Sequence, residues 1–425
     1  MRRLFTLVAA SAVAAGALVS SASATTSATA DYIVVYRAGT NVAVKTTRFE
    51  RANGFTADFR YTHALRGFAA KLSPAQLARV QADPAVAFIS RDRSVAAAGW
   101  EPLASGDSAP TGVRRIGAAS GSMVHQASTV NVAVIDTGID LNHSDLNAVN
   151  GKNCVRSNRT ANDDNGHGTH VSGTIAAKNN GSGVVGVAPG TRLYAVKVLN
   201  RNGSGTWSQV ICGIDWVTAN TSTLHIKVAS MSLGGSGSDG ACSSDALHQA
   251  MCNSTNAGVT YVVAAGNSAV NFSGFVPAAY DQVLTVTAMS DSDGSPGGTG
   301  GDPTCRTGEH DDWYASFSNY ATSTADINHT IAAPGVCIYS TWKSGGYNTI
   351  SGTSMATPHV TGSVALCIGN GGSAGPCAGL TPAQIVQKLR SDAQAHATAS
   401  NGFNGDPFHP VGSRYYGYLT YAGGY

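Results

Sequence analysis

Residues 351–359 read SGTSMATPH, and the apolar run VTGSVALCI at residues 360–368 follows them with the length of a helix. A serine hydroxyl is a poor nucleophile unless a base takes its proton and hydrogen-bond donors receive the oxyanion. Ser354, at a predicted loop-to-helix junction, meets part of that need, because unpaired backbone N–H groups and the positive end of the helix dipole lie there. Gly352 would let a substrate backbone approach closely. On its own, so short a motif favours a plainer interpretation, a turn in which Thr353 or Ser354 caps the helix.

Two polar motifs further upstream change that interpretation. Residues 132–140 read VAVIDTGID, which places Asp136 at the carboxyl end of a predicted strand. Residues 164–173 read DNGHGTHVSG, which places His167 between two glycines at the predicted start of a helix. An aspartate, a histidine and a serine in this chain order can orient a base, take a proton and attack a carbonyl. His170 is a competing base on sequence alone, because it lies on the same predicted helix.

The three motifs and their order resemble the subtilisin-like serine proteases, above all the secreted proteinase K-like enzymes, over roughly residues 110–395. The resemblance implies that Ser354 attacks the scissile carbonyl, that His167 takes and later donates the proton, and that Asp136 orients the imidazole. It makes His170 a structural residue. It also implies an α/β fold with a doubly wound, mostly parallel sheet and helices on both faces.

Further motifs fit the same family pattern. By resemblance, Asn267, which ends the run VVAAGN, donates its side-chain amide to the oxyanion beside the backbone N–H of Ser354. The run MSLGG at residues 231–235 resembles the edge to which an extended peptide adds as a strand. The residues expected around the substrate are Ser232, Leu233, Gly234, Ala264, Ala265 and Gly266. Their small, uncharged side chains favour large apolar or aromatic residues before the cleaved bond, although a buried structural strand is the alternative for Ser232 and Leu233.

Periodicity supports the same fold independently of the motifs. Short, nearly continuous apolar runs alternate with helical patterns, which is typical of parallel strands covered by helices on both faces. These runs are residues 132–135, 192–198, 227–231, 259–265 and 283–287. Ligand sites in such folds lie at the carboxyl ends of the strands. Residues 415–421 are expected to add a closing strand.

Composition and the N-terminus indicate where the protein acts. The 425-residue chain has a net charge of +2 and 12% charged residues, without the basic patch that nucleic acid requires. Arg2 and Arg3 precede an apolar run, and small residues follow it, so residues 1–24 read as a signal peptide rather than as a membrane anchor. We therefore expect a secreted, extracellular protein with no membrane association after export, acting as a monomer.

The region before the three motifs reads as two further parts. Residues 31–95 lack cysteine and predict the order βαββαβ, a small split sandwich that resembles the inhibitory propeptide of secreted subtilisin-like proteases. A small exported binding domain is the alternative. Residues 96–110 read as a linker with the maturation site, and residues 111–425 as the catalytic domain. By resemblance, the propeptide is an intramolecular chaperone and inhibitor, and protein and peptide substrates are the other partners.

The eight cysteines predict disulfides, because an exported chain with an even number of cysteines meets oxidising conditions. The nearest neighbours suggest Cys242–Cys252 and Cys367–Cys377, and elimination then suggests Cys305–Cys337 and Cys154–Cys212, among about 105 possible pairings. Free buried thiols are the alternative.

No cofactor is expected for the chemistry, and structural calcium is left open. By resemblance, YDQV at residues 280–283 is one part of a calcium site, whose usual second part is an aspartate shortly before an Ala-Pro-Gly turn. Thr330 holds that place, and Asp326 is nearby but shifted. A second acidic pair, Asp163 and Asp164, is expected to be a solvated loop.

These observations predict a secreted serine endopeptidase of broad specificity that is made as a self-processing zymogen. Two other classes stay open. A non-catalytic binding protein on a dead protease fold would need a broken triad, and an esterase or amidase of small molecules would not need the peptide-binding edge at residues 232–235.

Overall fold

The computed structural model describes residues 29–92, 99–243 and 245–425. The chain divides into two compact units, Met1–Ala96 and Ala97–Tyr425. The predicted signal peptide, residues 1–24, lies outside the described residues, as do residues 93–98 between the two units. Within the described part of the chain, no helix has the length and apolar character needed to cross a membrane.

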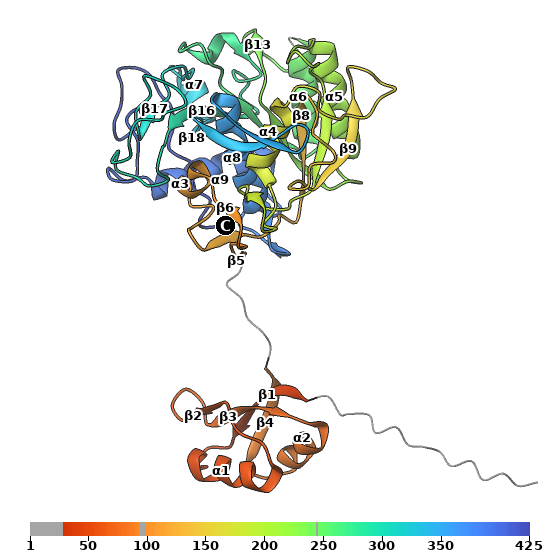
Figure 1. Cartoon of the computed structure of the whole chain (residues 1–425), viewed down its shortest axis with the longest axis vertical. Helices are drawn as coiled ribbons and strands as arrows, with labels where there is room; N and C mark the ends of the chain where they lie inside the picture. The colour runs from red at the N-terminus through yellow and green to blue at the C-terminus, as the bar shows by residue number, and fades with distance from the viewer. Residues whose placement is uncertain (1–28, 93–98, 244) are drawn as a thin grey trace, which may run out of the picture. The chain divides into compact units, whose positions relative to one another are not determined.

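The N-terminal unit has the predicted order βαββαβ (Figure 1). Its elements are β1 Ala30–Tyr36, α1 Val42–Asn53, β2 Phe59–Tyr61, β3 Gly67–Leu72, α2 Pro74–Gln81 and β4 Val86–Arg91. The strands form an antiparallel sheet in the order β2-β3-β1-β4. Val34, Phe49 and Phe68 are buried between this sheet and the helices, whereas Phe59 and Phe88 are exposed. The unit therefore has a core of its own and exposed aromatic residues on its surface.

An eight-stranded sheet forms the centre of the second unit. Its order is β17-β16-β14-β12-β8-β11-β9, and β18 pairs with β16. These strands are β8 Asn131–Asp136, β9 Ala148–Asn153, β11 Leu193–Lys197, β12 Ile226–Met231, β14 Thr260–Ala264, β16 Leu284–Ser290, β17 Trp313–Tyr314 and β18 Thr330–Pro334. All pairs are parallel except β16 with β17. The strand order reverses direction at β8, which is where doubly wound sheets bind ligands.

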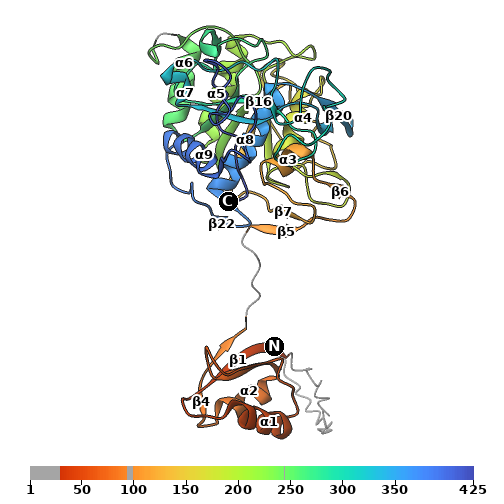
Figure 2. The same ribbon diagram turned by 90° about the vertical axis from the view of Figure 1, so that its left-hand side faces the viewer.

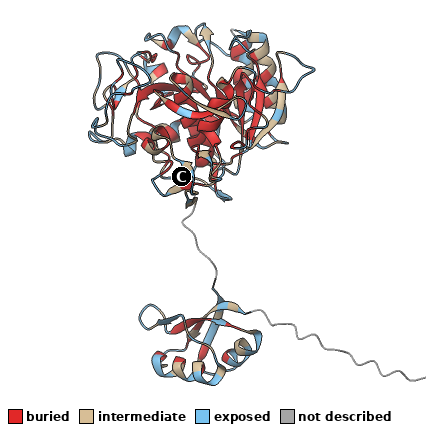
Figure 3. Cartoon of the chain, viewed as in Figure 1, coloured by how far each residue is buried: buried red, intermediate tan, exposed pale blue. Residues whose placement is uncertain are grey.

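Helices cover both faces of this sheet, as the continuous apolar strands predict. Val132 and Val134 of β8 face one core, which α4 (His167–Ala176), α8 (Thr353–Ile368) and α9 (Pro382–His396) complete. Ala133 and Ile135 face the opposite core, beneath α5 (Trp207–Asn220) and α6 (Ala246–Asn256). In two perpendicular views α8 lies at the centre of the unit (Figures 1 and 2), and the buried residues concentrate around it and in the sheet (Figure 3).

The segment read as a linker is partly built into the second unit. Trp100–Pro102 (β5) pairs with Met123–His125 (β7), and Asp107–Ser108 (β6) pairs with Gly183–Val184 (β10). The Trp100 ring lies 4.0 Å, between centroids, from that of the buried His125. Strand pairing and aromatic packing therefore order a segment whose composition resembles a loop.

The predicted closing strand at residues 415–421 is absent, which is a correction. This segment makes isolated bridges instead, from Tyr415 to Ala321 and from Leu419 to Ala332. Gly417 lies between them with a φ of 89°, which interrupts the extended conformation that a strand requires. The segment still covers the sheet edge, but only by single contacts.

Four disulfides bind the second unit, and the pairing suggested by cysteine spacing is confirmed. They join Cys154 to Cys212, Cys242 to Cys252, Cys305 to Cys337 and Cys367 to Cys377. The structure leaves no cysteine free within its described residues.

Candidate active site

Asp136 and His167 meet at the carboxyl edge of the sheet. Asp136 ends β8, and His167 begins α4 after Gly166, whose φ of 118° turns the chain sharply. The imidazole Nδ1 lies 2.8 Å from Oδ1 and 3.0 Å from Oδ2 of the Asp136 carboxylate. Asp136 is fully buried, while the His167 side chain is 25% exposed. The imidazole is thus held by Asp136 on one side and is open toward solvent on the other.

Glycine makes this close approach of strand and helix possible. A Cβ on Gly168 would lie 2.1 Å from the carbonyl oxygen of Gly138 and 3.1 Å from Cβ of Asp136. Gly138 has a φ of 107° and is itself crowded by the chain at Ala161. Any side chain at these two positions would push α4 away from the end of β8.

The charges around His167 make its imidazole a stronger base. Burial opposes the charged form, but the charge of Asp136, its hydrogen bond and the charge of Asp163 outweigh burial, so the pKa of His167 is raised above 6.5. His170 differs, because burial lowers its pKa to about 3. Its Nε2 lies 2.9 Å from the carbonyl oxygen of Ile338 and 3.1 Å from that of Asn348. His170 is therefore buried and held by the backbone, away from solvent.

Ser354 lies in the first turn of α8, beside the cleft that His167 lines. Its Oγ donates to the carbonyl oxygen of Ser232 at 3.3 Å, and Ser232 Oγ donates to the Ser354 carbonyl oxygen at 2.9 Å. His167 and Ser232 both line a cleft of about 870 Å³, whose walls also include Leu199 and Trp207. The Ser354 hydroxyl is thus turned toward the Ser232 carbonyl oxygen rather than toward the imidazole.

Asn267 is fixed against the start of the same helix. Its Oδ1 accepts from the backbone N–H of Thr353 at 2.8 Å and from Thr353 Oγ1 at 3.0 Å. Thr353 Oγ1 in turn accepts from the backbone N–H of Gly266 at 3.1 Å. With its oxygen held, Asn267 has its amide N–H₂ group close to Gly352, 3.5 Å from a Cβ built there. The amide is exposed and can donate to a ligand above the helix start.

These contacts correct the prediction that Thr353 or Ser354 caps the helix. The N-cap is Gly352, which has no side-chain cap, and Thr353 is the first helical residue. The Thr353 hydroxyl bonds to Asn267 and Gly266 across the site instead of to its own helix. Tertiary partners therefore take the hydroxyl that a local turn would have used.

The residues predicted around the substrate fall into two groups. Ser232, Leu233 and Gly234 line the cleft directly. Ala264, Ala265 and Gly266 are buried behind it, where the carbonyl oxygen of Ala265 and that of Gly266 accept from Asn319.

Sequence reasoning missed Phe275, which lies between these two groups. A Cβ on Gly234 would lie 2.4 Å from the Phe275 ring, and one on Gly266 would lie 3.1 Å from it. The ring is only partly buried. The Phe275 ring thus packs between the two glycine segments, and no local signal marks it because it follows a short helical turn far along the chain.

The expectation that Asp163 and Asp164 form a solvated loop is half wrong. Asp164 is exposed and its Oδ1 accepts from the buried Lys197 ammonium at 2.6 Å. Asp163 is 5% exposed and accepts from backbone N–H groups at the start of α4. No local capping signal marks Asp163, because the N-cap position of α4 is held by Gly166 and Asp163 lies before it.

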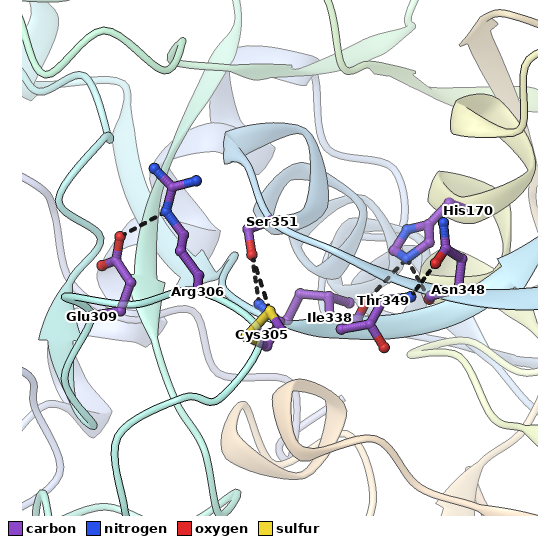
Figure 4. The surroundings of a disulfide bond; sticks show 9 residues. His170, Cys305, Arg306, Glu309, Ile338, Asn348, Thr349 and Ser351 are labelled. Atoms are coloured by element: carbon purple, nitrogen blue, oxygen red, sulfur yellow. Dashed lines mark hydrogen bonds and ion pairs between the residues drawn. A yellow bond between two sulfur atoms is a disulfide. The ribbon is translucent and has the colours of Figure 1, made fainter.

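A disulfide lies next to the segment that leads to Ser354. Ser351 Oγ accepts from the backbone N–H of Cys337 at 2.9 Å and lies 3.7 Å from Cys305 Sγ (Figure 4). The backbone N–H of Gly352 donates to the Gly335 carbonyl oxygen at 2.8 Å. The Cys305–Cys337 bond therefore anchors the chain that precedes the helix start.

The residues at the calcium position of the resemblance do not fit that ion. Calcium prefers 6–8 oxygen ligands. Here the half-exposed Asp281 carboxylate faces the imidazole of His329, with Oδ1 3.8 Å from Nε2, and the Thr330 hydroxyl donates to the Asp326 carbonyl oxygen. The His329 imidazole nitrogen and the hydrogen-bonded Thr330 hydroxyl thus stand where carboxylate oxygens would bind calcium.

A separate acidic group also lacks the character of a free cation site. Carboxylate atoms of Asp291, Asp293 and Asp311 lie within 4.8 Å of one another. The Arg115 guanidinium already lies 3.6 Å from Asp291, and Asp311 accepts from Ser292. An arginine therefore supplies positive charge at this group.

The parallel sheet with helices on both faces, and the Asp136–His167 pair at its carboxyl edge, are features of a serine peptidase. Residues 127–412 match the model of the Subtilase family, so the chain belongs to the subtilase family. Residues 19–98 match the model Peptidase inhibitor I9. The expected family, the expected fold and the serine protease activity are thereby confirmed.

Individual relatives agree with this assignment. The chain is 40% identical over 326 residues to the Extracellular serine proteinase of Thermus sp. (strain Rt41A), covering 74% of this chain and 68% of that one. It is 37% identical over 350 residues to Subtilisin E of Bacillus subtilis (strain 168), covering 81% and 79%. A solved cold adapted subtilisin-like serine proteinase is similar with a TM-score of 0.55 and 33% identity, covering 75% of this chain and 99% of that chain.

Proposed function

We propose that this subtilase is a secreted endopeptidase of broad specificity whose catalytic triad is Asp136, His167 and Ser354. The observation that carries the proposal is the 2.8 Å contact between His167 and Asp136 at the carboxyl end of β8. His167 lines a cleft together with Ser232, and Ser232 is hydrogen-bonded to Ser354. Side chains of the protein, one backbone N–H group and a water molecule supply each step.

Ser354 Oγ attacks the scissile carbonyl carbon as His167 Nε2 takes its proton, which forms a tetrahedral oxyanion. Asp136 holds the imidazole so that Nε2 faces the cleft and stabilises the imidazolium. Asn267 Nδ2 and the Ser354 N–H donate to the oxyanion. The imidazolium then protonates the leaving amine as the C–N bond breaks, which leaves the acyl group on Ser354. Water attacks this acyl group as His167 takes its proton, and His167 returns the proton to Ser354 Oγ as the acid product leaves.

Substrates are unfolded or extended protein segments. The peptide adds along residues 232–234 as a strand, so that backbone hydrogen bonds supply most of the recognition. Its residue before the cleaved bond lies between this edge and residues 264–266. Phe275 bounds that space with an aromatic ring, which supports apolar and aromatic residues there.

The N-terminal unit is the chain's own inhibitor and folding aid, removed by self-cleavage after export. Its match to an inhibitor model and its separate core support this role. We place the maturation cut before Trp100, because Trp100–Pro102 is already paired in the catalytic unit. The mature enzyme acts as a monomer outside the cell.

Casein hydrolysis and precursor processing test the proposal together. The purified precursor of Ser354→Ala should stay uncut and inactive, and a serine-directed fluorophosphonate should block casein hydrolysis by the wild-type enzyme. Normal self-processing of that variant would refute the assignment of Ser354. Cleavage of small esters without cleavage of casein would favour an esterase instead.

A further inference from the structure

The start of α4 holds a second buried carboxylate, Asp163, which the proposed mechanism does not use. Its Oδ1 accepts from Thr137 Oγ1 at 2.9 Å and from the backbone N–H groups of Asn165 at 2.9 Å and Gly166 at 3.0 Å. Its Oδ2 accepts from the backbone N–H and the hydroxyl of Thr169 at 3.0 and 2.6 Å. All five contacts are donors, and backbone N–H groups at a helix start stabilise an anion. Asp163 is therefore a buried carboxylate whose negative charge is stabilised by hydrogen bonds.

This hydrogen-bond network joins the two ends of the Asp136–His167 pair. Thr137 directly follows Asp136, and its Oγ1 donates to Asp163. The same Oγ1 accepts from the backbone N–H of Gly168 at 2.9 Å, and Gly168 directly follows His167. The Asp163 carboxylate thus connects the end of β8 to the first turn of α4. The connection is made at Thr137 and Gly168, the residues that directly follow Asp136 and His167.

The charges that face the catalytic imidazole are few. The carboxylates of Asp136 and Asp163 favour its charged form, and His170, buried on the next turn, is neutral. Lys197 of the neighbouring strand β11 bonds to the exposed Asp164 at 2.6 Å and to the carbonyl oxygens of adjacent loops. Within the described residues, no ionised side chain other than Asp136 forms an ion pair with the His167 imidazole. Removing Asp163 would therefore leave the imidazole with one carboxylate and make it less basic.

We propose that Asp163 is a positioning residue for catalysis, which fixes the separation of Asp136 and His167 through the hydroxyl of Thr137. The inference rests on the proposed triad. It assigns two effects to one side chain, a geometric effect that travels through the Thr137 hydroxyl and an electrostatic effect that needs only the charge. The two can be separated by substitution.

Asp163→Asn in the secreted, processed enzyme removes the charge at nearly constant shape. We expect kcat on a soluble peptide substrate to fall on the order of 10- to 100-fold with KM changed less than about threefold. We also expect the acidic limb of kcat/KM against pH to move to lower pH, because one of the charges that raise the pKa of His167 is removed. The matched control is Asp164→Asn, the neighbouring exposed carboxylate, which should change neither quantity.

Thr137→Val separates geometry from charge, since it removes the hydroxyl relay and keeps Asp163. We expect kcat to fall about tenfold while the acidic limb stays at its wild-type pH. This variant decides the proposal if Asp163→Asn does not fold, which circular dichroism and thermal unfolding of each protein will report. Wild-type kcat in Thr137→Val refutes the relay.

An unshifted acidic limb in folded Asp163→Asn, or an equal shift in Asp164→Asn, overturns the electrostatic role. Failure of the triad itself gives a different result: His167→Ala would then retain wild-type kcat. An inactive His167→Ala with an unshifted Asp163→Asn therefore refutes only the role of Asp163.

Discussion

Thr353 and Asn267, far apart in the chain, are joined by two hydrogen bonds at the start of α8. The Asn267 carboxamide oxygen accepts from the Thr353 backbone N–H at 2.8 Å and from its hydroxyl at 3.0 Å. Because the oxygen is held in this way, the amide nitrogen is the part of Asn267 that is free to face a substrate. The contact therefore preorganises the proposed oxyanion donor before any substrate binds.

Replacing Asn267 with leucine removes the proposed donor and keeps a similar volume. We expect kcat to fall about 10²–10³-fold with little change in KM, because the oxyanion forms only after attack on the carbonyl. Steady-state kinetics on a peptide amide substrate measure both constants. A loss confined to KM would instead make Asn267 a ground-state binding residue.

Replacing Thr353 with valine removes the hydroxyl that holds Asn267. The Gly266 N–H loses its acceptor, which costs roughly 1–3 kcal/mol of folding free energy, and the amide of Asn267 gains freedom. We expect a lower unfolding midpoint and a kcat reduced about tenfold. Thr353→Ser keeps the hydroxyl and serves as the control. Equal losses in the two variants would show that the methyl group, not the hydroxyl, matters.

Replacing Phe275 with alanine should enlarge the space before the cleaved bond. We expect the ratio of kcat/KM for tryptophan over alanine at that substrate position to rise at least about tenfold, because an apolar pocket discriminates by fit. The matched control is Phe408→Ala, a phenylalanine that is 50% exposed and has none of the atoms nearest to a Cβ at Gly234 or Gly266. An unchanged ratio would remove Phe275 from the specificity pocket.

Buried histidines should make the catalytic unit sensitive to acid. Burial lowers the pKa of His125, His329 and His359 to about 4 and that of His170 to about 3. Below pH 6.5 these histidines bind protons in the unfolded chain but stay neutral in the folded one. Their contribution to the free energy of unfolding is therefore complete above that pH and is lost as pH falls toward 4.

Two buried carboxylates act in the opposite direction. Burial raises the pKa of Asp145 to about 6 and that of Asp291 to about 7, so acid relieves a cost that they impose at neutral pH. Four histidines outweigh two aspartates, and we expect the free energy of unfolding to fall on the order of 1–3 kcal/mol per pH unit between pH 6 and 4. Urea unfolding of the fluorophosphonate-inactivated enzyme, followed by tryptophan fluorescence, measures it. A constant midpoint between pH 8 and 4 would contradict this sign.

Reducing conditions or paired serine substitutions test the Cys305–Cys337 disulfide. It closes a loop with a sequence separation of 32 residues, and its loss should cost about 2–4 kcal/mol of stability. The backbone N–H of Cys337 donates to Ser351, and loss of the disulfide frees this segment, so we expect a lower kcat as well. The Cys367–Cys377 pair, with a separation of 10, is the control for stability loss without change in kcat.

Local sequence determined much of this protein. Continuous apolar strands between helical segments specify a two-sided parallel sheet, since a parallel strand has no face open to water. Asp136, His167 and Ser354 were predicted as a triad because their motifs stand at a predicted strand end or helix start and follow the chain order of the family, whereas Asn267 was predicted by resemblance alone. Cysteine spacing also indicated the four disulfides.

Tertiary structure alone decided the remaining features. The Thr353 hydroxyl could have capped its own helix, and only the approach of Asn267 and Gly266 from another strand redirects it. Asp163 reads as a solvated loop residue until Thr137 and the start of α4 enclose it, and only the fold packs Phe275 between two distant glycine segments. Sequence patterns indicate on which strand, helix or loop a side chain stands. Its hydrogen-bond partners and its burial depend on residues that only the fold brings within 3–4 Å.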